Sequence, residues 1–144
     1  MSFVKVWIHA VWTTKRRAPL LIKEKRQIIF NHILDNGIAK GIYVHCVNGH
    51  KDHVHCLFKL RNDETIMKTM QMLKGESSYW ANKNKVLPHK LYWQNEFYAV
   101  SVSESIVPNV QDYIQNQEEH HKDYSWEEEY NNFIKNYGFQ VLKS

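Results

Sequence analysis

The sequence predicts an α+β fold, namely a ferredoxin-like antiparallel sheet of βαββαβ order with its helices on one face. Two observations lead to this prediction. Residues 52–60 alternate between polar and apolar side chains, as a strand with one buried face does. Segments with helical periodicity separate the strand-like segments, so both crossover connections are helical. Such a sheet leaves its second face free for a site.

The first half of the chain supplies a strand, a helix and a hairpin. We expect a strand at 3–13, where Lys5, Trp7, His9 and Val11 alternate with an apolar set on the other face. A helix is expected at 22–36, ended by Asp35-Asn-Gly37. Strands at 42–47 and 53–60 follow, and Asn48-Gly49 between them indicates a hairpin.

The second half supplies two helices, a strand and a tail. Asn62-Asp63 is expected to cap a helix at 64–82, and a strand follows at 97–102. Pro108 favours a helix start, and the apolar spacing predicts a helix at 107–122. In the tail, Ser125 and Glu128 have capping-box spacing, which predicts a packing helix that ends at Gly138. Its aromatic stripe is expected to pack in the core or an interface: Trp126, Tyr130, Phe133 and Tyr137.

Composition indicates one domain over residues 1–144, with a core at about 1–122 and a packing helix at 123–144. A chain of 144 residues with 43% apolar and 24% charged residues can bury a core of its own. No apolar stretch approaches the roughly 20 residues that a membrane-spanning helix needs. The start of the chain lacks the layout of a secretory signal. We therefore expect a cytoplasmic protein with no membrane partner.

The pair His53 and His55 is the strongest candidate for a functional site. In a strand both imidazoles point to the same side, opposite the apolar Val54, Cys56 and Phe58. Two neutral imidazoles on one strand face can bind a divalent cation once a third group completes the site. Downstream, Tyr113 and Gln117 are four residues apart and share one helix face.

Cysteine and further histidine residues raise zinc as an alternative metal. Cys46 and Cys56 are expected to be reduced core residues that face away from His45, His53 and His55. Four zinc ligands could then not converge without breaking the strand alternation. His9 fits either a neighbour of the site or a satisfied sheet histidine. His120-His121 could extend a metal or phosphate site, but a solvated helix end is favoured.

Charge is unevenly distributed along the chain. Residues 1–102 contain 16 Lys and Arg against 7 Asp and Glu, a net +9, whereas residues 103–144 contain 3 against 8, a net −5. The cluster Lys15, Arg16 and Arg17 is the clearest candidate for binding DNA phosphates. Tyr92 and Trp93 could stack on unpaired bases. Gly75 weakens the helix in which it is predicted and permits a close approach of some other group.

Several phrases resemble one protein family. These are HVH at 53–55, Tyr113 followed by Gln117, and the longer phrases HAVWTTKRRAP, LKGESSYW and YIQNQEEHH. From about His9 to His121 the chain resembles the single-tyrosine HUH nucleases, in particular the transposases of small bacterial insertion sequences and their relatives associated with repeated palindromes.

The resemblance implies a metal-dependent transposase that cuts and rejoins single-stranded or hairpin DNA. It implies that Tyr113 is the nucleophile and forms a 5′-phosphotyrosine, and that His53, His55 and Gln117 bind Mg²⁺ or Mn²⁺. Because these ligands are neutral, the full charge of the cation would act on the phosphate. A homodimer is also implied, in which the tyrosine helix of one subunit could serve the other.

Blander interpretations and two other functions are also compatible with the residues. Taken singly, His53 and His55 could be exposed polar residues of a sheet with one buried face. Tyr113 alone could be a packed helix residue, and Gln117 alone could be a surface residue. Their combination favours the enzyme. The alternative functions are a domesticated HUH nickase and a non-catalytic, basic nucleic-acid-binding module of ferredoxin-like fold.

Overall fold

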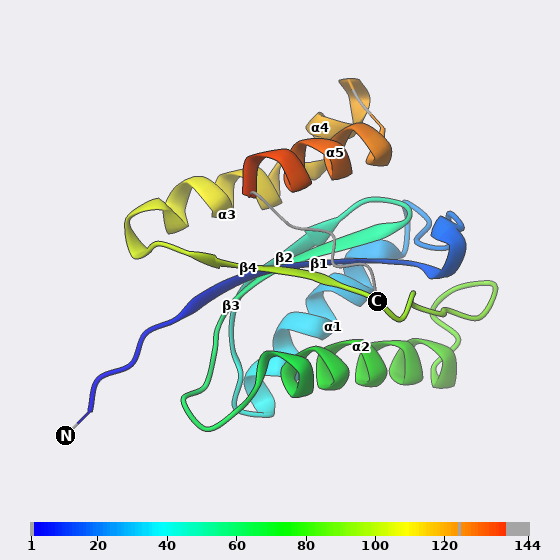
Figure 1. Cartoon of the computed structure of the whole chain (residues 1–144). Coiled ribbons are helices and arrows are strands. Elements are labelled where there is room, and N and C mark those ends of the chain that lie inside the picture. Colours follow the sequence, from blue (N-terminus) through cyan, green and yellow to red (C-terminus); the bar gives the residue numbers. More distant parts are fainter. Residues whose placement is uncertain (1, 124, 138–144) are drawn as a thin grey trace.

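The computed structural model describes residues 2–123 and 125–137, with the side chains of residues 122–123 and 133–137 left undescribed. A four-stranded antiparallel sheet has the strand order β2-β3-β1-β4. Helices α1 and α2 cover one face, and α3, α4 and α5 lie on the other (Figure 1). The ferredoxin-like βαββαβ fold is confirmed.

The elements have the following bounds. The strands are β1 (Trp7–Thr13), β2 (Tyr43–Gly49), β3 (His53–Lys59) and β4 (Tyr98–Val102). The long helices are α1 (Arg26–Ala39) and α2 (Ile66–Lys83), and the later helices are α3 (Val107–Gln115), α4 (Gln117–Asp123) and α5 (Trp126–Tyr137). Two short 3-10 turns, η1 (Lys15–Arg17) and η2 (Glu104–Ile106), complete the described elements.

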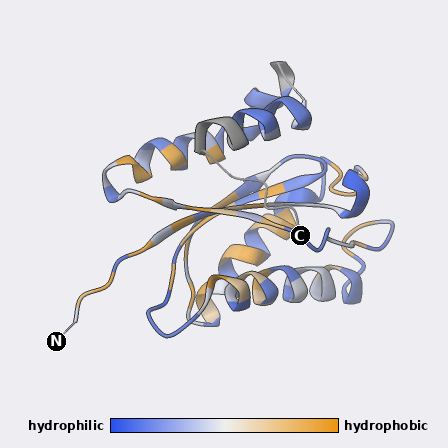
Figure 2. Cartoon of the chain, viewed as in Figure 1, coloured by the Kyte–Doolittle hydropathy of each residue, from blue (hydrophilic) through white to orange (hydrophobic). Residues whose placement is uncertain are grey.

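Two hydrophobic cores lie on the two faces of the sheet. The larger core is between the sheet and α1 and α2, and the strands and α1 carry much of the hydrophobic colour in Figure 2. The smaller core joins Trp7, Leu57 and Val102 of the sheet to Val110 and Ile114 of α3. Both faces of β3 are therefore buried. The expected half-buried strand is wrong, because three late helices cover the face that carries the histidines.

Helix α1 is longer at its C-terminus than the sequence predicts. Gly37 was expected to end it, yet the helix continues to Ala39 and the turn falls at Gly41, whose φ is +88°. A Cβ atom at Gly37 would lie 2.6 Å from Val44 Cγ2. Gly37 therefore permits close packing of α1 against β2 and does not break the helix.

A β-bulge in β2 alters which side chains face the site. The pairing shifts between Val44 and Cys46, so Cys46 pairs with Leu57 and joins the smaller core. Both cysteines are buried and free, as expected, but Cys46 lies on the face of the histidines and not opposite them. The extra residue of a bulge moves the side chains that follow it to the other face.

Two predicted helix boundaries are also wrong. Thr65, not Asn62-Asp63, caps α2, since its side chain accepts a hydrogen bond of 3.1 Å from the Lys68 N–H. The helix expected at 107–122 is divided at Asn116 into α3 and α4. At this break the Asn48 side chain donates hydrogen bonds to the carbonyls of Ile114 and Gln115, at 3.0 and 3.1 Å. The expected hairpin between β2 and β3 is confirmed, but its turn follows Asn48-Gly49, because both residues pair with β3 and the His50 N–H group bonds the His53 carbonyl at 3.1 Å.

Candidate active site

His53 and His55 project from β3 toward the late helices. Successive residues of a strand point to opposite faces, so both imidazoles lie on the face that α3, α4 and α5 cover. Their ring centroids are 5.3 Å apart and both side chains are fully buried. The structure thus brings the pair together as the sequence predicts, in a setting with no exposure to solvent.

Gln117 completes the predicted group from the start of α4. The His53 Nε2–H group donates a hydrogen bond of 2.9 Å to Gln117 Oε1, and Gln117 is fully buried. On the other side of the ring, His53 Nδ1–H donates to Asp52 Oδ1 at 2.8 Å. A carboxylate at Nδ1 fixes the orientation of an imidazole, and the Nε2 atom is left to point into the site.

Glu129 of α5 is the residue that the sequence analysis missed. Its carboxylate contacts His55 Nε2 and His121 Nε2, and its second oxygen lies 3.6 Å from His53 Nε2. The ligand atoms of His53, His55 and Glu129 all lie within 4.8 Å of one another, and all three residues are buried. This cluster can hold a divalent metal ion.

A signal for Glu129 is present in the tail. It lies three residues after Trp126 and one before Tyr130, so it shares the inward side of α5 with the aromatic stripe. Trp126 packs against His53 with 4.5 Å between ring centroids, and Tyr130 packs edge-on against Tyr98 at 5.2 Å. An acidic residue within an apolar stripe is a candidate for a buried function. The remainder of that stripe, Phe133 and Tyr137, lies outside the described side chains.

The cluster carries both signs of charge. Burial opposes the charged form of Glu129, but hydrogen bonds from His121, His53 and His55 outweigh it and hold its pKa well below the usual range. Burial also opposes a charged His53, yet hydrogen bonds to Asp52 and Glu129 raise its pKa to about 9. Burial lowers the pKa of His55. Without a metal, the cluster therefore contains an imidazolium between two carboxylates.

The donor set fits a divalent ion. Two imidazole nitrogens and a carboxylate oxygen lie within 4.8 Å of one another, the Gln117 amide oxygen lies 2.9 Å from one of these nitrogens, and divalent transition metals accept this mixture. Among the described residues, the buried Gln117 Nε2 has no hydrogen-bond partner, which leaves a donor for a phosphate oxygen. Because Glu129 is anionic, the expectation of an entirely neutral ligand set does not agree with the geometry of this cluster.

Tyr113 lies beside the histidine pair of its own chain. Its ring centroid is 5.6 Å from that of His55, 6.4 Å from that of His9 and 4.6 Å from that of His120. The smaller core fixes the position of α3, since Ile114 is fully buried. The structure therefore assembles tyrosine, glutamine and both histidines within one subunit.

Three other histidines support this arrangement. His9 lies on the predicted face of β1, and its Nε2–H group donates to His55 Nδ1 at 2.9 Å, which makes it a neighbour of the site. His121 contacts Glu129 and His120 stacks on Tyr113. The expectation that His120 and His121 form a solvated helix end is wrong, because the His121 side chain is only 4% exposed and contacts Glu129 of α5, and His120 is half-buried against Tyr113.

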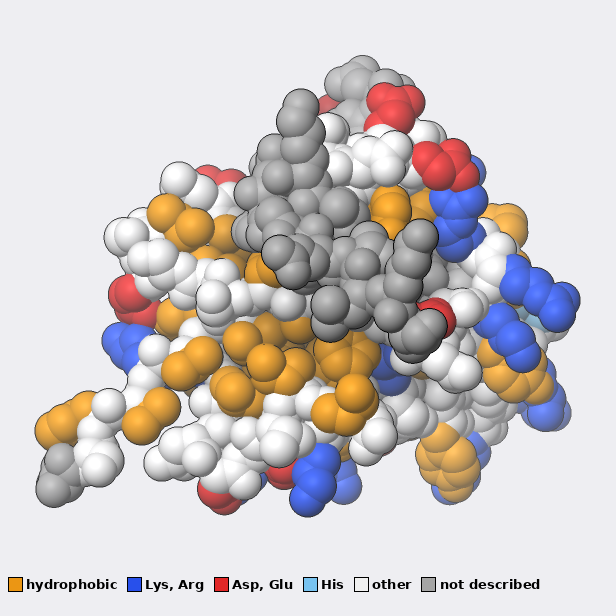
Figure 3. Space-filling view, viewed as in Figure 1, with side chains coloured by type: hydrophobic (Ala, Val, Ile, Leu, Met, Phe, Trp, Pro, Cys, Tyr) orange, Lys and Arg blue, Asp and Glu red, His pale blue; other side chains and the backbone are white. Residues whose placement is uncertain are grey.

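The basic cluster Lys15, Arg16 and Arg17 forms η1 next to the site. All three side chains are exposed, and Lys and Arg gather at this end of the molecule in Figure 3. Arg16 and Arg17 line two cavities of about 310 and 320 Å³ that adjoin Trp126. Arg17 forms an ion pair with Glu127 of α5.

Comparison with known proteins decides the family. The family model described as "Transposase IS200 like" matches residues 2–117. The chain belongs to the IS200-like transposases. The match includes His53, His55, Tyr113 and Gln117 and ends before α5, so Glu129 lies outside it.

Two solved structures resemble this IS200-like transposase. A protein from Deinococcus radiodurans R1, provisionally named a transposase, is 26% identical with a TM-score of 0.61, over 81% of this chain and 93% of that one. A REP-associated tyrosine transposase bound to a REP hairpin is 18% identical with a TM-score of 0.59, over 84% of this chain and 72% of that one. The second likeness shows the fold. A search of curated proteins found no match.

Two remaining predictions concern zinc and membranes. Among the described residues, the candidate metal cluster contains His53, His55 and Glu129 and neither cysteine. Burial raises the pKa of the Cys46 thiol to about 12, which disfavours the thiolate that zinc requires. In the part of the chain that the structure describes, no helix is long and apolar enough to span a membrane.

Proposed function

We propose that this transposase cuts and rejoins single-stranded DNA through a covalent 5′-phosphotyrosine on Tyr113. The observation that carries the proposal is the position of the Tyr113 ring, 5.6 Å from His55 and within the same subunit as the candidate metal cluster. A nucleophile next to a buried cation site is an arrangement suited to phosphoryl transfer.

His53, His55 and Gln117 would hold Mg²⁺ or Mn²⁺, with Glu129 as a fourth ligand. When bound, the cation would act as a Lewis acid toward the phosphodiester. Asp52 and His9 would keep the two imidazoles oriented, because each hydrogen-bonds the Nδ1 side of one ring.

Tyr113 would attack phosphorus through its phenolic oxygen. The new Tyr–O–P bond forms as the bond from phosphorus to the 3′ oxygen breaks, and the departing oxygen takes a proton to become a 3′-OH. A second 3′-OH can then attack the phosphotyrosine, which restores the phenol and joins the strands without ATP. A free phenol has a pKa of about 10, so its proton needs an acceptor. His120, whose ring centroid lies 4.6 Å from that of Tyr113, is a candidate for this acceptor.

The substrate class is single-stranded or hairpin DNA. Lys15, Arg16 and Arg17 would contact its phosphates, since they are exposed beside the cavities that lead to the cluster. The solved relative with a bound REP hairpin supports a hairpin as the first substrate to try. An enzyme that acts on such DNA would work in the cytoplasm.

Covalent trapping tests the proposal. Labelled single-stranded DNA and Mn²⁺ should give an adduct that resists SDS, and Tyr113→Phe should abolish it. Tyr79→Phe is a matched control, because Tyr79 is an exposed tyrosine on α2 and lies outside the site. An adduct that persists in Tyr113→Phe would contradict the assignment of the nucleophile.

A non-catalytic DNA-binding module is the second candidate, and the full burial of His53 and His55 favours it. Such a protein would bind the DNA and give no adduct with any divalent metal. A domesticated nickase would give the adduct and a cut strand, but no joined product when a second 3′-OH is added.

The homodimer remains a prediction of the family resemblance. Tyr113, His55, His53 and Gln117 lie together in one chain, and this supports cleavage by a subunit's own tyrosine. Sedimentation with and without hairpin DNA measures the oligomeric state directly.

A further inference from the structure

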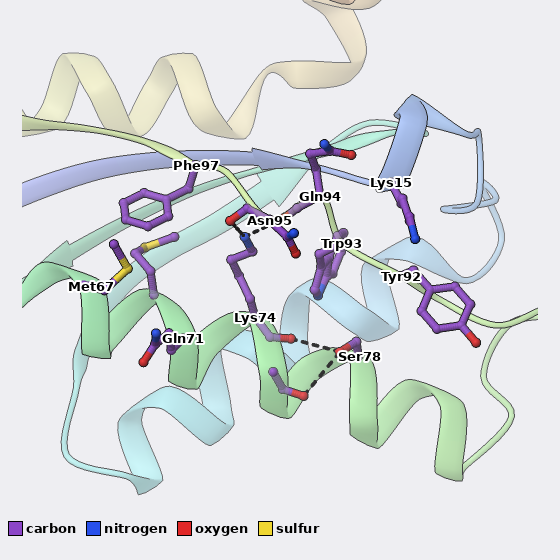
Figure 4. Close-up of a pocket in the computed structure, with 12 residues that line it drawn as sticks. Lys15, Met67, Gln71, Lys74, Ser78, Tyr92, Trp93, Gln94, Asn95 and Phe97 are labelled. Atoms are coloured by element: carbon purple, nitrogen blue, oxygen red, sulfur yellow. Dashed lines mark hydrogen bonds between the residues drawn. The ribbon is translucent and has the colours of Figure 1, made fainter. Parts of the chain in front are cut away.

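A further cavity, separate from the two beside Trp126, lies away from the histidines, between α2 and the segment that leads to β4. Its volume is about 610 Å³, within the range of small-ligand pockets. Figure 4 shows Met67, Gln71 and Ser78 of α2 along one side and Trp93 and Phe97 along the other. The proposed strand-transfer chemistry uses none of these side chains.

Aromatic and amide groups form the walls. Trp93 is held in place, because its Nε1–H group donates to Ser77 Oγ at 3.0 Å and its ring packs edge-on against Trp12 at 5.9 Å. Tyr92 is 55% exposed and presents its ring at the rim, next to Lys15 (Figure 4). Gln71 and Asn95 add exposed amides. Flat rings with nearby amides are what proteins use to bind unpaired bases.

Gly75 lies in the middle of α2 and lines the same cavity. A Cβ atom at this position would meet nothing within 4 Å, so the packing of the protein itself does not require glycine there. Glycine within a helix costs stability relative to alanine. Within the protein, no close approach is made at Gly75, and the glycine leaves open space in the wall of the cavity.

Lys74 makes the opposite wall rigid. Its Nζ group donates to the carbonyls of Gln94, Asn95 and Glu96, at 2.7, 2.9 and 3.3 Å, and the residue is buried. An ammonium group has three N–H donors, and these carbonyls occupy all of them. Lys74 therefore fixes the 94–96 segment, whereas the exposed Lys15 at the rim is placed to meet a phosphate.

The cavity is continuous with the basic turn beside the candidate active site. The Lys15 N–H group donates to the Tyr92 carbonyl at 2.8 Å, and the Arg16 N–H group donates to Gln94 Oε1 at 3.2 Å. Lys15 lines the 610 Å³ cavity, while Arg16 and Arg17 line the cavities next to Trp126. One strand of DNA can therefore follow η1 from the cavity as far as Trp126, which packs against the buried His53.

We propose that this cavity binds an unpaired base of the single-stranded DNA, with the adjoining phosphates on Lys15, Arg16 and Arg17. The base would stack against Tyr92 and pass over Gly75, which fixes the register of the strand relative to Tyr113. The inference rests on the proposed function, because it assigns a subsite for the same DNA. A nucleic acid is favoured over a peptide because the cavity opens onto a cationic turn.

Binding measurements in the non-cleaving Tyr113→Phe background test this subsite separately from the chemistry. Single-stranded oligonucleotides with one abasic site at successive positions should reveal one position where loss of the base weakens binding about tenfold, the size expected for one stacked base. Tyr92→Ala and Gly75→Leu should each weaken binding of the intact oligonucleotide by a similar factor. In both variants, the abasic site at that position should cause no further loss of DNA affinity.

Two controls keep the result interpretable. Tyr79→Ala removes an exposed tyrosine of α2 outside the cavity and should leave binding unchanged. Gly75→Leu should raise the melting temperature, because leucine favours a helix and meets open space, so weaker binding cannot come from unfolding. If no abasic position weakens binding, the cavity is not a base site. The same conclusion follows if the abasic site weakens binding as much in Tyr92→Ala and Gly75→Leu as it does without these substitutions. That result would overturn the subsite even where Tyr113 forms its adduct.

Discussion

Glu129 changes the chemistry expected of His53 and His55, because it places an anionic oxygen beside two imidazoles. Its carboxylate contacts His55 and His121 and lies 3.6 Å from His53 Nε2. An anionic ligand strengthens the hold on a cation and reduces the positive charge that acts on a phosphate. Glu129 would therefore increase metal affinity at some cost in Lewis acidity.

The substitution Glu129→Gln tests this role, since it keeps the size of the side chain and removes its charge. We expect Mn²⁺ affinity, measured by titration calorimetry, to fall at least tenfold, in line with the loss of one metal-binding contact. Glu128→Gln is the matched control, because Glu128 is exposed on the same helix. Equal affinity in the two variants would show that Glu129 covers the cluster without binding the metal.

The protonation of His53 should make the metal-free protein sensitive to pH. Its pKa rises from the usual 6.5 to about 9, because hydrogen bonds to Asp52 and Glu129 outweigh burial. A raised pKa contributes stability that is fully present below pH 6.5 and is lost as the pH rises through 9. Urea unfolding in EDTA should therefore show a loss of up to about 3 kcal/mol between pH 6.5 and pH 9. His53→Gln should flatten this part of the profile.

The predicted site residues were accessible to sequence reasoning for a physical reason. Alternation in a strand places His53 and His55 together regardless of context. The expected shared helix face of Tyr113 and Gln117 is wrong, because the break at Asn116 puts them on α3 and α4, although each still lies beside the histidine pair. Glu129 is separated from His55 by 74 residues and reaches it through tertiary packing of α5. Its place in the run Glu127 to Glu129 makes it look like a solvated charge, and only the neighbouring aromatic stripe indicates otherwise.

At the level of elements, the order of strands and helices was predictable, and several boundaries were not. Hydrophobic periodicity determines where a strand or helix is favourable, whereas side chains from distant segments decide where it ends. Gly37 ends no helix because Val44 packs against its backbone. The bulge at His45 leaves no mark in the alternation and moves Cys46 to the other face.

The division between α3 and α4 has a similar origin and a consequence for the site. The Asn48 side-chain amide donates hydrogen bonds to the carbonyls of Ile114 and Gln115, so the chain turns at Asn116 before α4 begins. Gln117 is the first residue of α4, and it bonds His53 directly. A contact from the β2 end of the hairpin therefore sets the position of a proposed metal ligand.

At the scale of the whole molecule, the two faces of the sheet have different tasks. Helices α1 and α2 complete the larger core and carry the base-sized cavity, whereas α3, α4 and α5 enclose the histidine cluster (Figure 1). His53, His55, Gln117 and Glu129 are all at most 1% exposed. A phosphodiester cannot contact a fully buried cluster, so the proposed cleavage would require α5 to move away from β3.

The ion pair between Arg17 and Glu127 connects α5 to the basic turn and should resist this movement. Both side chains are largely exposed, so the pair contributes at most about 1 kcal/mol, or roughly fivefold in an opening equilibrium. Glu127→Ala should therefore raise the single-turnover rate of adduct formation at saturating DNA by up to about fivefold. Glu128→Ala should leave that rate unchanged, because Glu128 is exposed on the same turn of the helix.

Glu127→Ala has a second consequence, because it frees Arg17 to bind a DNA phosphate. Measuring the rate at saturating DNA separates easier opening of α5 from this tighter DNA binding. Tighter DNA binding changes the concentration at which the rate saturates, whereas easier opening of α5 changes the saturated rate itself. High salt should narrow the difference between the wild-type protein and Glu127→Ala, since salt screens the exposed pair in the former. A saturated rate that is the same in both proteins would mean that α5 opens without breaking this contact, or that opening does not limit the reaction.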